Sequence, residues 1–305
     1  MSELPGKVWG VIKRYKVIVG SLLLVLLVLG GLFIYSGMWP PVYVVESASM
    51  QHSDTESSLG LIDTGDLVVV QSSDGSDVKT YVECYPDGER SFGDYGDVIV
   101  YQRYGSSENT PIIHRAMMLV VYNATSNSFD IPSLASLPSD KWDCNGAEGQ
   151  WWNLTEYVVI YDVGYQSATL RVELNSLMDY YERYSLNVDG LQGYITMGDH
   201  NIQYSGGEYK GLYDQSSQQI CLALIDDDWI VGEAKQEIAW LGLIKLWVNG
   251  QMPSYTPENS KTAMIAVIAI VIIVPIALDV TNYVLQKKGI DVWKGLKERF
   301  KRKEE

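Results

Sequence analysis

Two long apolar segments without charge constrain this 305-residue chain most strongly. The first, 17–36, contains twenty residues that are almost all apolar, and the second, 262–278, contains seventeen, including Pro275. A helix of about 20 apolar residues spans the roughly 30 Å hydrocarbon core of a bilayer, and neighbouring helices can accommodate a proline there. The sequence therefore predicts transmembrane helices over 17–37 and 261–279.

Formal charge is distributed unevenly around these segments. The chain has 38 acidic and 23 basic residues, for a net charge of −15; residues 1–16 carry +3, residues 261–305 carry +4 and residues 37–260 carry −22. Because basic flanks mark the cytoplasmic side of membrane helices, we expect a multi-pass cell-membrane protein with both termini cytoplasmic. The predicted C-terminal cytoplasmic tail is residues 280–305. The acidic domain, 38–260, is then extracytoplasmic. Its charge excludes nucleic acid as a partner, because phosphates require Lys and Arg.

A cleaved signal peptide is the alternative interpretation of the first apolar segment. Its apolar run is longer than the core of about 7–15 residues that signal peptides use. The sequence that follows, Ser-Gly-Met-Trp-Pro-Pro, also lacks an Ala-x-Ala cleavage site. We therefore favour an anchor that is retained.

The region between the apolar segments is rich in strand signals. Short runs of β-branched and aromatic residues are bounded by Gly, Asp, Ser and Asn clusters, which is typical of strands and turns. Helical periodicity is confined to 174–184 and 234–246. We predict a mainly β fold, with a β-rich extracytoplasmic domain flanked by two transmembrane α-helices. The clearest strand runs are 67–70, 98–101, 118–122 and 157–161.

Cysteines and glycosylation sequons fall in the predicted exterior domain. Asn123 and Asn153 begin Asn-x-Thr sequons, which are common by chance. No Cys-x-x-Cys or matching His spacing supports a zinc site, so the sequence predicts neither a metal nor another cofactor. The simplest expectation for the cysteines is one disulfide and one free thiol, with an unreadable pairing. The three cysteines are Cys84, Cys144 and Cys221.

A Ser-Ala-Ser-Met segment follows the first apolar segment, and only three histidines are available as general bases. Ser49 can attack an acyl carbon only if a neighbouring base removes its proton. Ser47, two residues earlier on an extended chain, points to the same side. Alone, Ser-x-Ser-Met is a weak signal that usually belongs to a surface loop. The candidate bases are His52, His114 and His200.

Six short motifs follow one another along the chain. In chain order they are Ser47-Ala48-Ser49-Met50, Gly65-Asp66-Leu67-Val68-Val69-Val70, Gly96-Asp97-Val98-Ile99-Val100-Tyr101, Ile112-Ile113-His114-Arg115, Ile195-Thr196-Met197-Gly198-Asp199-His200-Asn201 and Tyr213-Asp214-Gln215. This ordered set is similar to type I signal peptidases of the archaeal and endoplasmic-reticulum branch, and the resemblance covers most of residues 17–233. It implies a signal-peptidase-like, β-rich catalytic domain in which histidine replaces the lysine base of the bacterial branch.

The resemblance implies a role for each matching residue. Ser49 matches the nucleophile, His114 the general base, and Ser47 the hydroxyl that assists the oxyanion hole. Asp199 and Asp214 match two acidic positions, and the sequence does not distinguish which of them orients the imidazole. The implied activity is that of a membrane-bound serine endopeptidase that cleaves signal peptides from exported preproteins. Its implied partners are preprotein signal peptides and membrane lipid, with the protein-export channel as a further candidate.

The chain departs from the family pattern at three places. His52 stands where the family often has proline and is a rival base, but a local loop cannot easily direct it at the serine, so we prefer His114. The chain between His114 and the later Gly-Asp motif is much longer than a minimal member needs, so we predict an inserted subdomain at about 123–190. The spacing of 15 residues between Asp199 and Asp214 is also stretched.

Each motif also has a non-catalytic explanation. Without the other motifs, His114 reads as an ordinary half-buried strand histidine and Asp199 as a turn residue. We expect Asp66 and Asp97 in turns, without a catalytic role, and 226–228 in a solvated turn. The competing functional hypotheses are a non-catalytic, membrane-anchored surface or glycan-binding protein and a related protease of envelope precursors.

Overall fold

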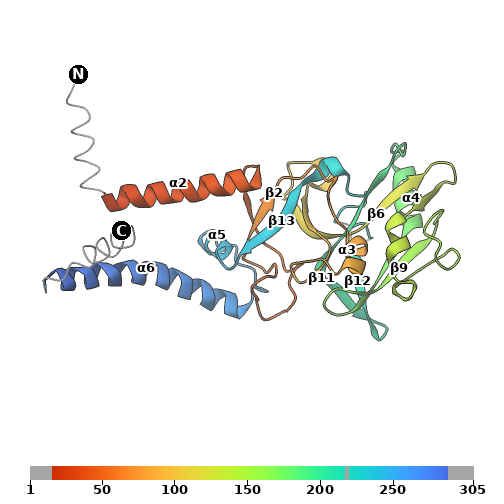
Figure 1. Cartoon of the computed structure of the whole chain (residues 1–305). Coiled ribbons are helices and arrows are strands. Elements are labelled where there is room, and N and C mark those ends of the chain that lie inside the picture. The colour runs from red at the N-terminus through yellow and green to blue at the C-terminus, as the bar shows by residue number, and fades with distance from the viewer. Residues whose placement is uncertain (1–15, 217–219, 288–305) are drawn as a thin grey trace, which may run out of the picture.

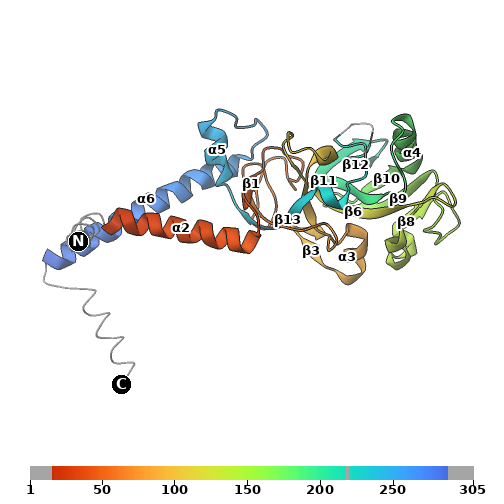
Figure 2. The same ribbon diagram turned by 90° about the horizontal axis from the view of Figure 1, so that it is seen from above.

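A β-rich domain carries two long helices that project from the same side of it (Figures 1 and 2). The computed structural model describes residues 16–216 and 220–287. The helices are α2 (Lys16–Ser36) and α6 (Glu258–Lys287). The predicted β-rich fold is confirmed. The predicted cytoplasmic N-terminus and most of the predicted cytoplasmic tail lie outside the described residues.

Among the described residues, one helical segment is long and apolar enough to cross a membrane, Glu258–Ala277 in α6. The apolar stretch Leu22–Ser36 of α2 is shorter than a membrane span requires. Most of its large side chains are nevertheless exposed, with Leu27 at 73 %. The structure thus supports one membrane span of the two that the sequence predicts.

One mixed sheet of eleven strands forms the framework of the domain, in the order β1-β2-β13-β5-β6-β11-β12-β10-β9-β8, with β7 beside β6. All neighbouring strands are antiparallel except β10 and β12, which run parallel over two residue pairs. The strands of this sheet are β1 (Val42–Val44), β2 (Leu67–Gln71), β5 (Val98–Tyr101), β6 (Ile112–Asn123), β7 (Ser128–Asp130), β8 (Trp142–Cys144), β9 (Tyr157–Val163), β10 (Ala168–Glu173), β11 (Gln192–Ser205), β12 (Glu208–Tyr213) and β13 (Ile230–Ile238).

Short elements complete the domain. The two-stranded hairpin β3 (Arg90–Ser91) and β4 (Asp94–Tyr95) follows α3 (Tyr81–Asp87). Thr80 caps α3 through a capping box with Glu83, in which each side chain binds the other's backbone N–H. The remaining helices are α4 (Leu174–Arg183) and α5 (Gly242–Val248), together with four short 3₁₀ turns, Arg103–Gly105, Pro132–Ser136, Ser139–Lys141 and Asp227–Trp229.

The sequence patterns locate most of these elements. The four predicted strand runs lie in β2, β5, β6 and β9, and the helix predicted over 174–184 is α4. The helix predicted over 234–246 is wrong in its first half, because 234–238 belongs to β13. That strand pairs with β2 on one side and β5 on the other, and this pairing outweighs a weak helical periodicity. Only α5 is helical there.

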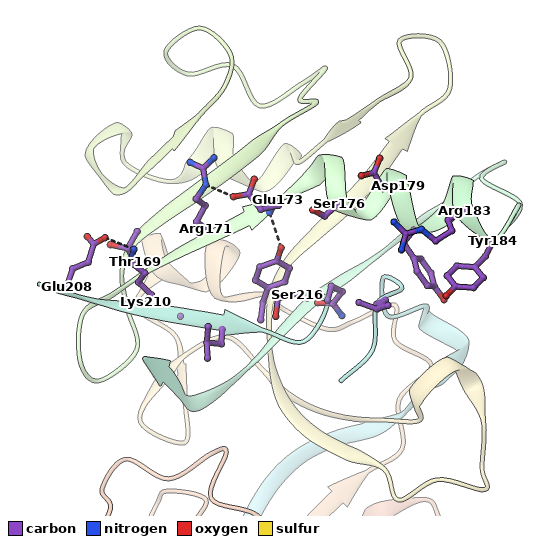
Figure 3. Close-up of a pocket in the computed structure, with 16 residues that line it drawn as sticks. Thr169, Arg171, Glu173, Ser176, Asp179, Arg183, Tyr184, Glu208, Lys210 and Ser216 are labelled. Atoms are coloured by element: carbon purple, nitrogen blue, oxygen red, sulfur yellow. Dashed lines mark hydrogen bonds and ion pairs between the residues drawn. The ribbon is translucent and has the colours of Figure 1, made fainter. Parts of the chain in front are cut away.

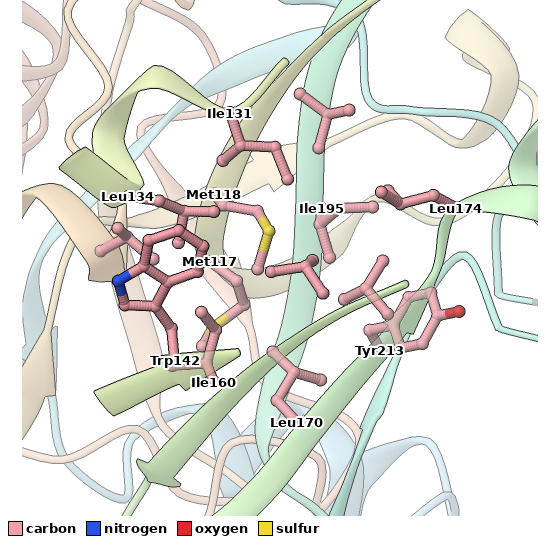
Figure 4. Packing of buried hydrophobic residues seen from close by; sticks show 14 of the residues in the cluster. Met117, Met118, Ile131, Leu134, Trp142, Ile160, Leu170, Leu174, Ile195 and Tyr213 are labelled. Atoms are coloured by element: carbon pink, nitrogen blue, oxygen red, sulfur yellow. The ribbon is translucent and has the colours of Figure 1, made fainter. Parts of the chain in front are cut away.

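The largest hydrophobic core joins the central strands to the segment between 123 and 190 (Figure 4). Met117 and Met118 of β6 and Ile195 of β11 pack with Trp142 of β8 and Leu170 of β10. Burial of one such side chain stabilises the fold by roughly 1.5–3 kcal/mol. The segment predicted as an inserted subdomain therefore shares its core with the strands that carry the candidate site.

All three cysteines are free and buried, so the predicted disulfide is wrong. Cys84 lies in α3, Cys144 ends β8, and Cys221 follows β12, so each thiol packs in a different part of the domain. A buried thiol behaves as a small apolar side chain. Burial raises the pKa of Cys84, and it raises that of Cys221 to about 11. Both groups therefore remain protonated and unreactive at neutral pH.

This packing predicts how the thiols react. In mild detergent the folded protein should show no rapidly reacting thiol, and denaturant without reductant should expose three. Titration with an aromatic disulfide reagent measures both values. A single reactive thiol after unfolding without reductant would show that the other two are bonded.

Candidate active site

Three separate parts of the chain bring Ser49, His114 and Asp214 together. Ser49 lies in the turn after β1, His114 near the start of β6, and Asp214 just after β12. Ser49 Oγ is 2.9 Å from His114 Nε2, and His114 Nδ1 is 2.7 and 2.8 Å from the two carboxylate oxygens of Asp214. A carboxylate in this place orients the imidazole, which can then accept the proton of the serine hydroxyl.

Asp214 is only 1 % exposed and is held by two further hydrogen bonds. Its carboxylate accepts from the Tyr101 hydroxyl at 2.7 Å and from Thr196 Oγ1 at 2.6 Å. Burial and the nearby carboxylate hold the pKa of Tyr101 well above its ordinary value, so the phenol remains a donor. With His114, three donors from different strands satisfy the buried carboxylate, as burial of such a group requires. Asp214 is therefore the acid that orients the histidine.

The other predicted acid, Asp199, belongs to a second buried network. Its carboxylate accepts from Arg115 Nε at 2.8 Å and Arg115 Nη2 at 2.5 Å, and it is 2.9 Å from His52 Nε2. Arg115 Nη1 also donates to the carbonyls of Ser91 and Gly96, each at 2.8 Å. Burial disfavours the charged carboxylate, but Arg115 and His52 hold the pKa of Asp199 below its ordinary value. Asp199 therefore acts as a buried anchor for Arg115.

The two other histidines are engaged elsewhere. The His52 ring lies against Tyr165, with ring centroids 5.0 Å apart, and its Nε2 faces Asp199. The His200 ring stacks on Tyr165 as well, at 6.2 Å. Of the three histidines, only the one in β6 forms a hydrogen bond with Ser49 Oγ. The choice of His114 over His52 as the candidate general base thus agrees with the geometry.

β11 passes so close to the nucleophile that only glycine fits at position 198. The backbone N–H of His200 donates to the Ser49 carbonyl at 2.8 Å. A Cβ on Gly198 would lie 2.4 Å from that carbonyl oxygen and 2.8 Å from His114 Nε2. The sequence marked Gly198 only as part of a motif, because this close approach depends on two segments that are far apart in the chain.

We predict that Gly198→Ala destabilises the protein by about 1–3 kcal/mol, because the added methyl group forces backbone or side-chain shifts in a packed site. Denaturant unfolding in detergent measures the change. Gly30→Ala is the control, since a Cβ there meets no atom within 4 Å. Wild-type stability of Gly198→Ala would contradict the close approach of β11.

The turn before β2 holds the segment that carries Ser49. Thr64 Oγ1 donates to the Ser47 carbonyl at 2.9 Å and also binds the Gln51 side chain. The N–H of Gly65 donates to the Val45 carbonyl at 2.9 Å. These bonds fix the nucleophile segment on both sides of the serine.

The Asp66 side chain stabilises the same turn through hydrogen bonds. Its buried carboxylate accepts from the backbone N–H groups of Asp63 at 2.9 Å and Trp240 at 2.8 Å. Burial raises the pKa of Asp66 to about 7, although both hydrogen bonds favour the charged form. Because an unfolded aspartate has a pKa near about 4, the folded protein binds this proton more tightly than the unfolded chain. This contribution to stability is full below about pH 4 and is lost as the pH rises towards about 7.

The pKa of Asp66 predicts a change in the pH dependence of folding. In Asp66→Asn, the free energy of unfolding should decline less between about pH 4 and about pH 7 than in the wild type. Urea unfolding in detergent across this range measures the decline. Asp140→Asn, at an exposed position, should keep the wild-type decline. An equal decline in Asp66→Asn would contradict the raised pKa.

The other acidic residues that we expected in turns have structural partners. Asp97 Oδ2 accepts from the Lys79 N–H at 2.9 Å. The Asp226 side chain caps a short 3₁₀ turn by accepting from the Asp228 N–H at 2.9 Å. These contacts account for both groups without a catalytic role.

A small cleft of about 170 Å³ opens beside the nucleophile. Residues 44–50 form one wall and residues 110–114 the other, and both serines and His114 line it. Ser47 Oγ lies 3.1 Å from Ser49 Oγ, on the same side of the extended segment as expected. The cleft is thus open to an acyl group at the serine.

A larger pocket of about 620 Å³ lies where β10 and β12 diverge, next to α4 (Figure 3). Its charges are partly balanced internally, since Arg171 pairs with Glu173 and Lys210 with Glu208. The pocket therefore indicates no particular ligand. Across the described residues, no group of three or more His, Cys, Asp or Glu side chains is placed to hold a metal ion.

The two sequon asparagines are neighbours at one end of the sheet. Asn123 Nδ2 donates to Asp130 at 3.1 Å and lies 3.5 Å from Asn153 Oδ1. Asn153 is exposed and accepts from Ser126 Oγ at 2.7 Å.

Comparison with known proteins yields no match: no protein-family model matches this sequence, and no curated protein is significantly similar to it. The functional interpretation therefore rests on the geometry of the site and on the ordered motifs.

Proposed function

We propose that the protein is a membrane-bound serine endopeptidase that cleaves signal peptides from exported preproteins at the extracytoplasmic face of the cell membrane. The observation that carries the proposal is the hydrogen-bonded chain from Ser49 through His114 to the buried Asp214. The ordered motifs around these residues, with their resemblance to archaeal and endoplasmic-reticulum signal peptidases, favour signal peptides as the substrate class.

In the proposed reaction, Ser49 Oγ attacks the scissile carbonyl while His114 Nε2 takes its proton. Asp214 stabilises the imidazolium that forms. The histidine then gives this proton to the leaving amine as the peptide bond breaks, which leaves an acyl group on the serine. His114 next removes a proton from water, which attacks the ester and releases the signal peptide with its new carboxyl end. The proton returns to Ser49 Oγ.

Donors for the developing oxyanion come from the nucleophile segment in this proposal. The backbone N–H of Ser49 and the hydroxyl of Ser47 lie on the segment that lines the cleft. Loss of one such donor typically removes about 3 kcal/mol of transition-state stabilisation, which slows the reaction by about 10²–10³-fold.

An extended peptide fits between the two walls of the small cleft. Within the part of the chain that the structure describes, β1 pairs only with β2, so its outer edge has no strand neighbour there. Backbone pairing with such an edge gives affinity, and pockets for alternate side chains give selectivity. The small cleft volume supports small side chains before the scissile bond, which the resemblance also implies.

The placement of the catalytic chain also supports the proposal. α2 is a strongly apolar helix of 21 residues, and its apolar stretch Leu22–Ser36 ends at the β-rich domain. Ser49 follows α2 after the short strand β1. With α2 and α6 both in the membrane, the nucleophile would lie near the point where a signal peptide leaves the bilayer.

Three variants of the proposed catalytic residues and one control variant test the chemistry. Ser49→Ala and His114→Ala should each reduce preprotein cleavage by about 10⁶-fold, and Asp214→Asn by about 10⁴-fold. His52→Ala should stay within about tenfold of the wild type, because this histidine does not contact the serine. Gel analysis of preprotein cleavage by the full chain in lipid vesicles, with mass spectrometry of the product ends, measures these effects.

Full activity in both Ser49→Ala and His114→Ala would rule out the proposed mechanism. Absence of cleavage by the wild-type chain would instead favour a non-catalytic surface or glycan-binding protein. A related protease of envelope precursors uses the same chemistry. Profiling of cleaved substrates separates that activity from general signal-peptide processing.

A further inference from the structure

α5 has two contrasting faces. Leu243 and Leu246 are buried and pack against Met264 of α6. On the opposite face, Trp247 is 66 % exposed and Val248 is 72 % exposed. A surface helix usually has a polar outward face, but the outward face of α5 is apolar as well. No described residue covers these side chains.

α5 lies at the junction between the β-rich domain and the two projecting helices in both views (Figures 1 and 2). Aromatic residues flank the same junction along the chain. Trp39, 67 % exposed, comes shortly after α2 ends, and Tyr255, 46 % exposed, comes shortly before α6 begins. Trp and Tyr favour the level of lipid headgroups, where one end of the side chain is apolar and the other wet.

The one charged residue of α5 is neutralised by its neighbour. Lys245 Nζ lies 2.9 Å from the Glu46 carboxylate, and the Tyr255 hydroxyl donates to the Glu46 carbonyl at 3.0 Å. Glu46 directly precedes Ser47 in the wall of the small cleft. In addition, the Leu243 N–H donates to the Gly65 carbonyl at 3.0 Å. α5 thus contacts the nucleophile segment through Glu46 and the turn before β2 through Gly65.

We propose that α5 is an interfacial helix whose outward face, Trp247 and Val248 with Ile244, inserts into the outer lipid leaflet beside the domain-side ends of α2 and α6. An exposed apolar face continuous with a membrane-spanning helix loses its contact with water when it enters the headgroup–acyl boundary. Through Glu46 and Gly65 this insertion holds the nucleophile segment at a fixed height above the bilayer. The inference shares one premise with the proposed function, namely that α6 spans the membrane.

Fluorescent probes at three positions of the full chain test the insertion. Val248→Cys reports on α5, Ile272→Cys on the middle of α6, and Tyr204→Cys on an exposed part of β11, away from the junction. Each variant is labelled with bimane and reconstituted in phosphatidylcholine–phosphatidylglycerol vesicles. Lipids brominated near the headgroup and aqueous iodide serve as the two quenchers, and labelled wild-type protein gives the background from buried native thiols.

We expect the brominated lipid to quench the probe at 248 and iodide to reach it poorly, while the probe at 204 shows the reverse. Lipid quenching at 272 but not at 248 overturns the role of α5 and leaves the membrane anchor intact. Absence of lipid quenching at both positions overturns the anchor as well. Protection of the probe at 248 from both quenchers also overturns the inference, because a protein surface rather than lipid would then cover α5.

Discussion

The buried carboxylate of Asp214 is the constraint on which the candidate site depends. A carboxylate with almost no contact with water is stable only if hydrogen-bond donors replace its hydration. Here the donors come from Tyr101 in β5, His114 in β6 and Thr196 in β11. Three adjacent strands must therefore keep their register for the carboxylate to be satisfied. The same register presents the histidine to Ser49, so the stability of the sheet and the geometry of the site have a common origin.

Two neighbouring residues of β6 bind different candidate acids. Successive side chains of a strand point to opposite faces, and His114 binds Asp214 while Arg115 binds Asp199. Arg115 also donates to carbonyls of the β3–β4 hairpin, so Asp199 supports the structure around the site. Asp214 orients His114 as a base, and Asp199 neutralises the buried guanidinium of Arg115. Strand pairing, rather than the acids themselves, determines these different roles.

Sequence patterns predicted the elements but not the contacts between them. The strand runs were found because β-branched residues between turn signals are a local property. Ser49 stood out through the ordered motifs, and His114 because the chain has only three histidines. The sequence did not distinguish Asp199 from Asp214, because their partners come from strands distant in the chain. The same limit explains the wrong disulfide and the helix wrongly predicted over the end of β13. It also explains why Gly198 appeared only as a motif residue.

The central claim is that a base held by Asp214 is hydrogen-bonded to the nucleophile. The most direct measurement is the pH dependence of alkylation of the thiol in Ser49→Cys, since the native thiols are buried. A thiolate paired with imidazolium titrates well below the free-thiol value of about 8.5. The account predicts such a low inflection in Ser49→Cys and its return to the ordinary range when His114→Ala is added. The same profile with and without the histidine would contradict it.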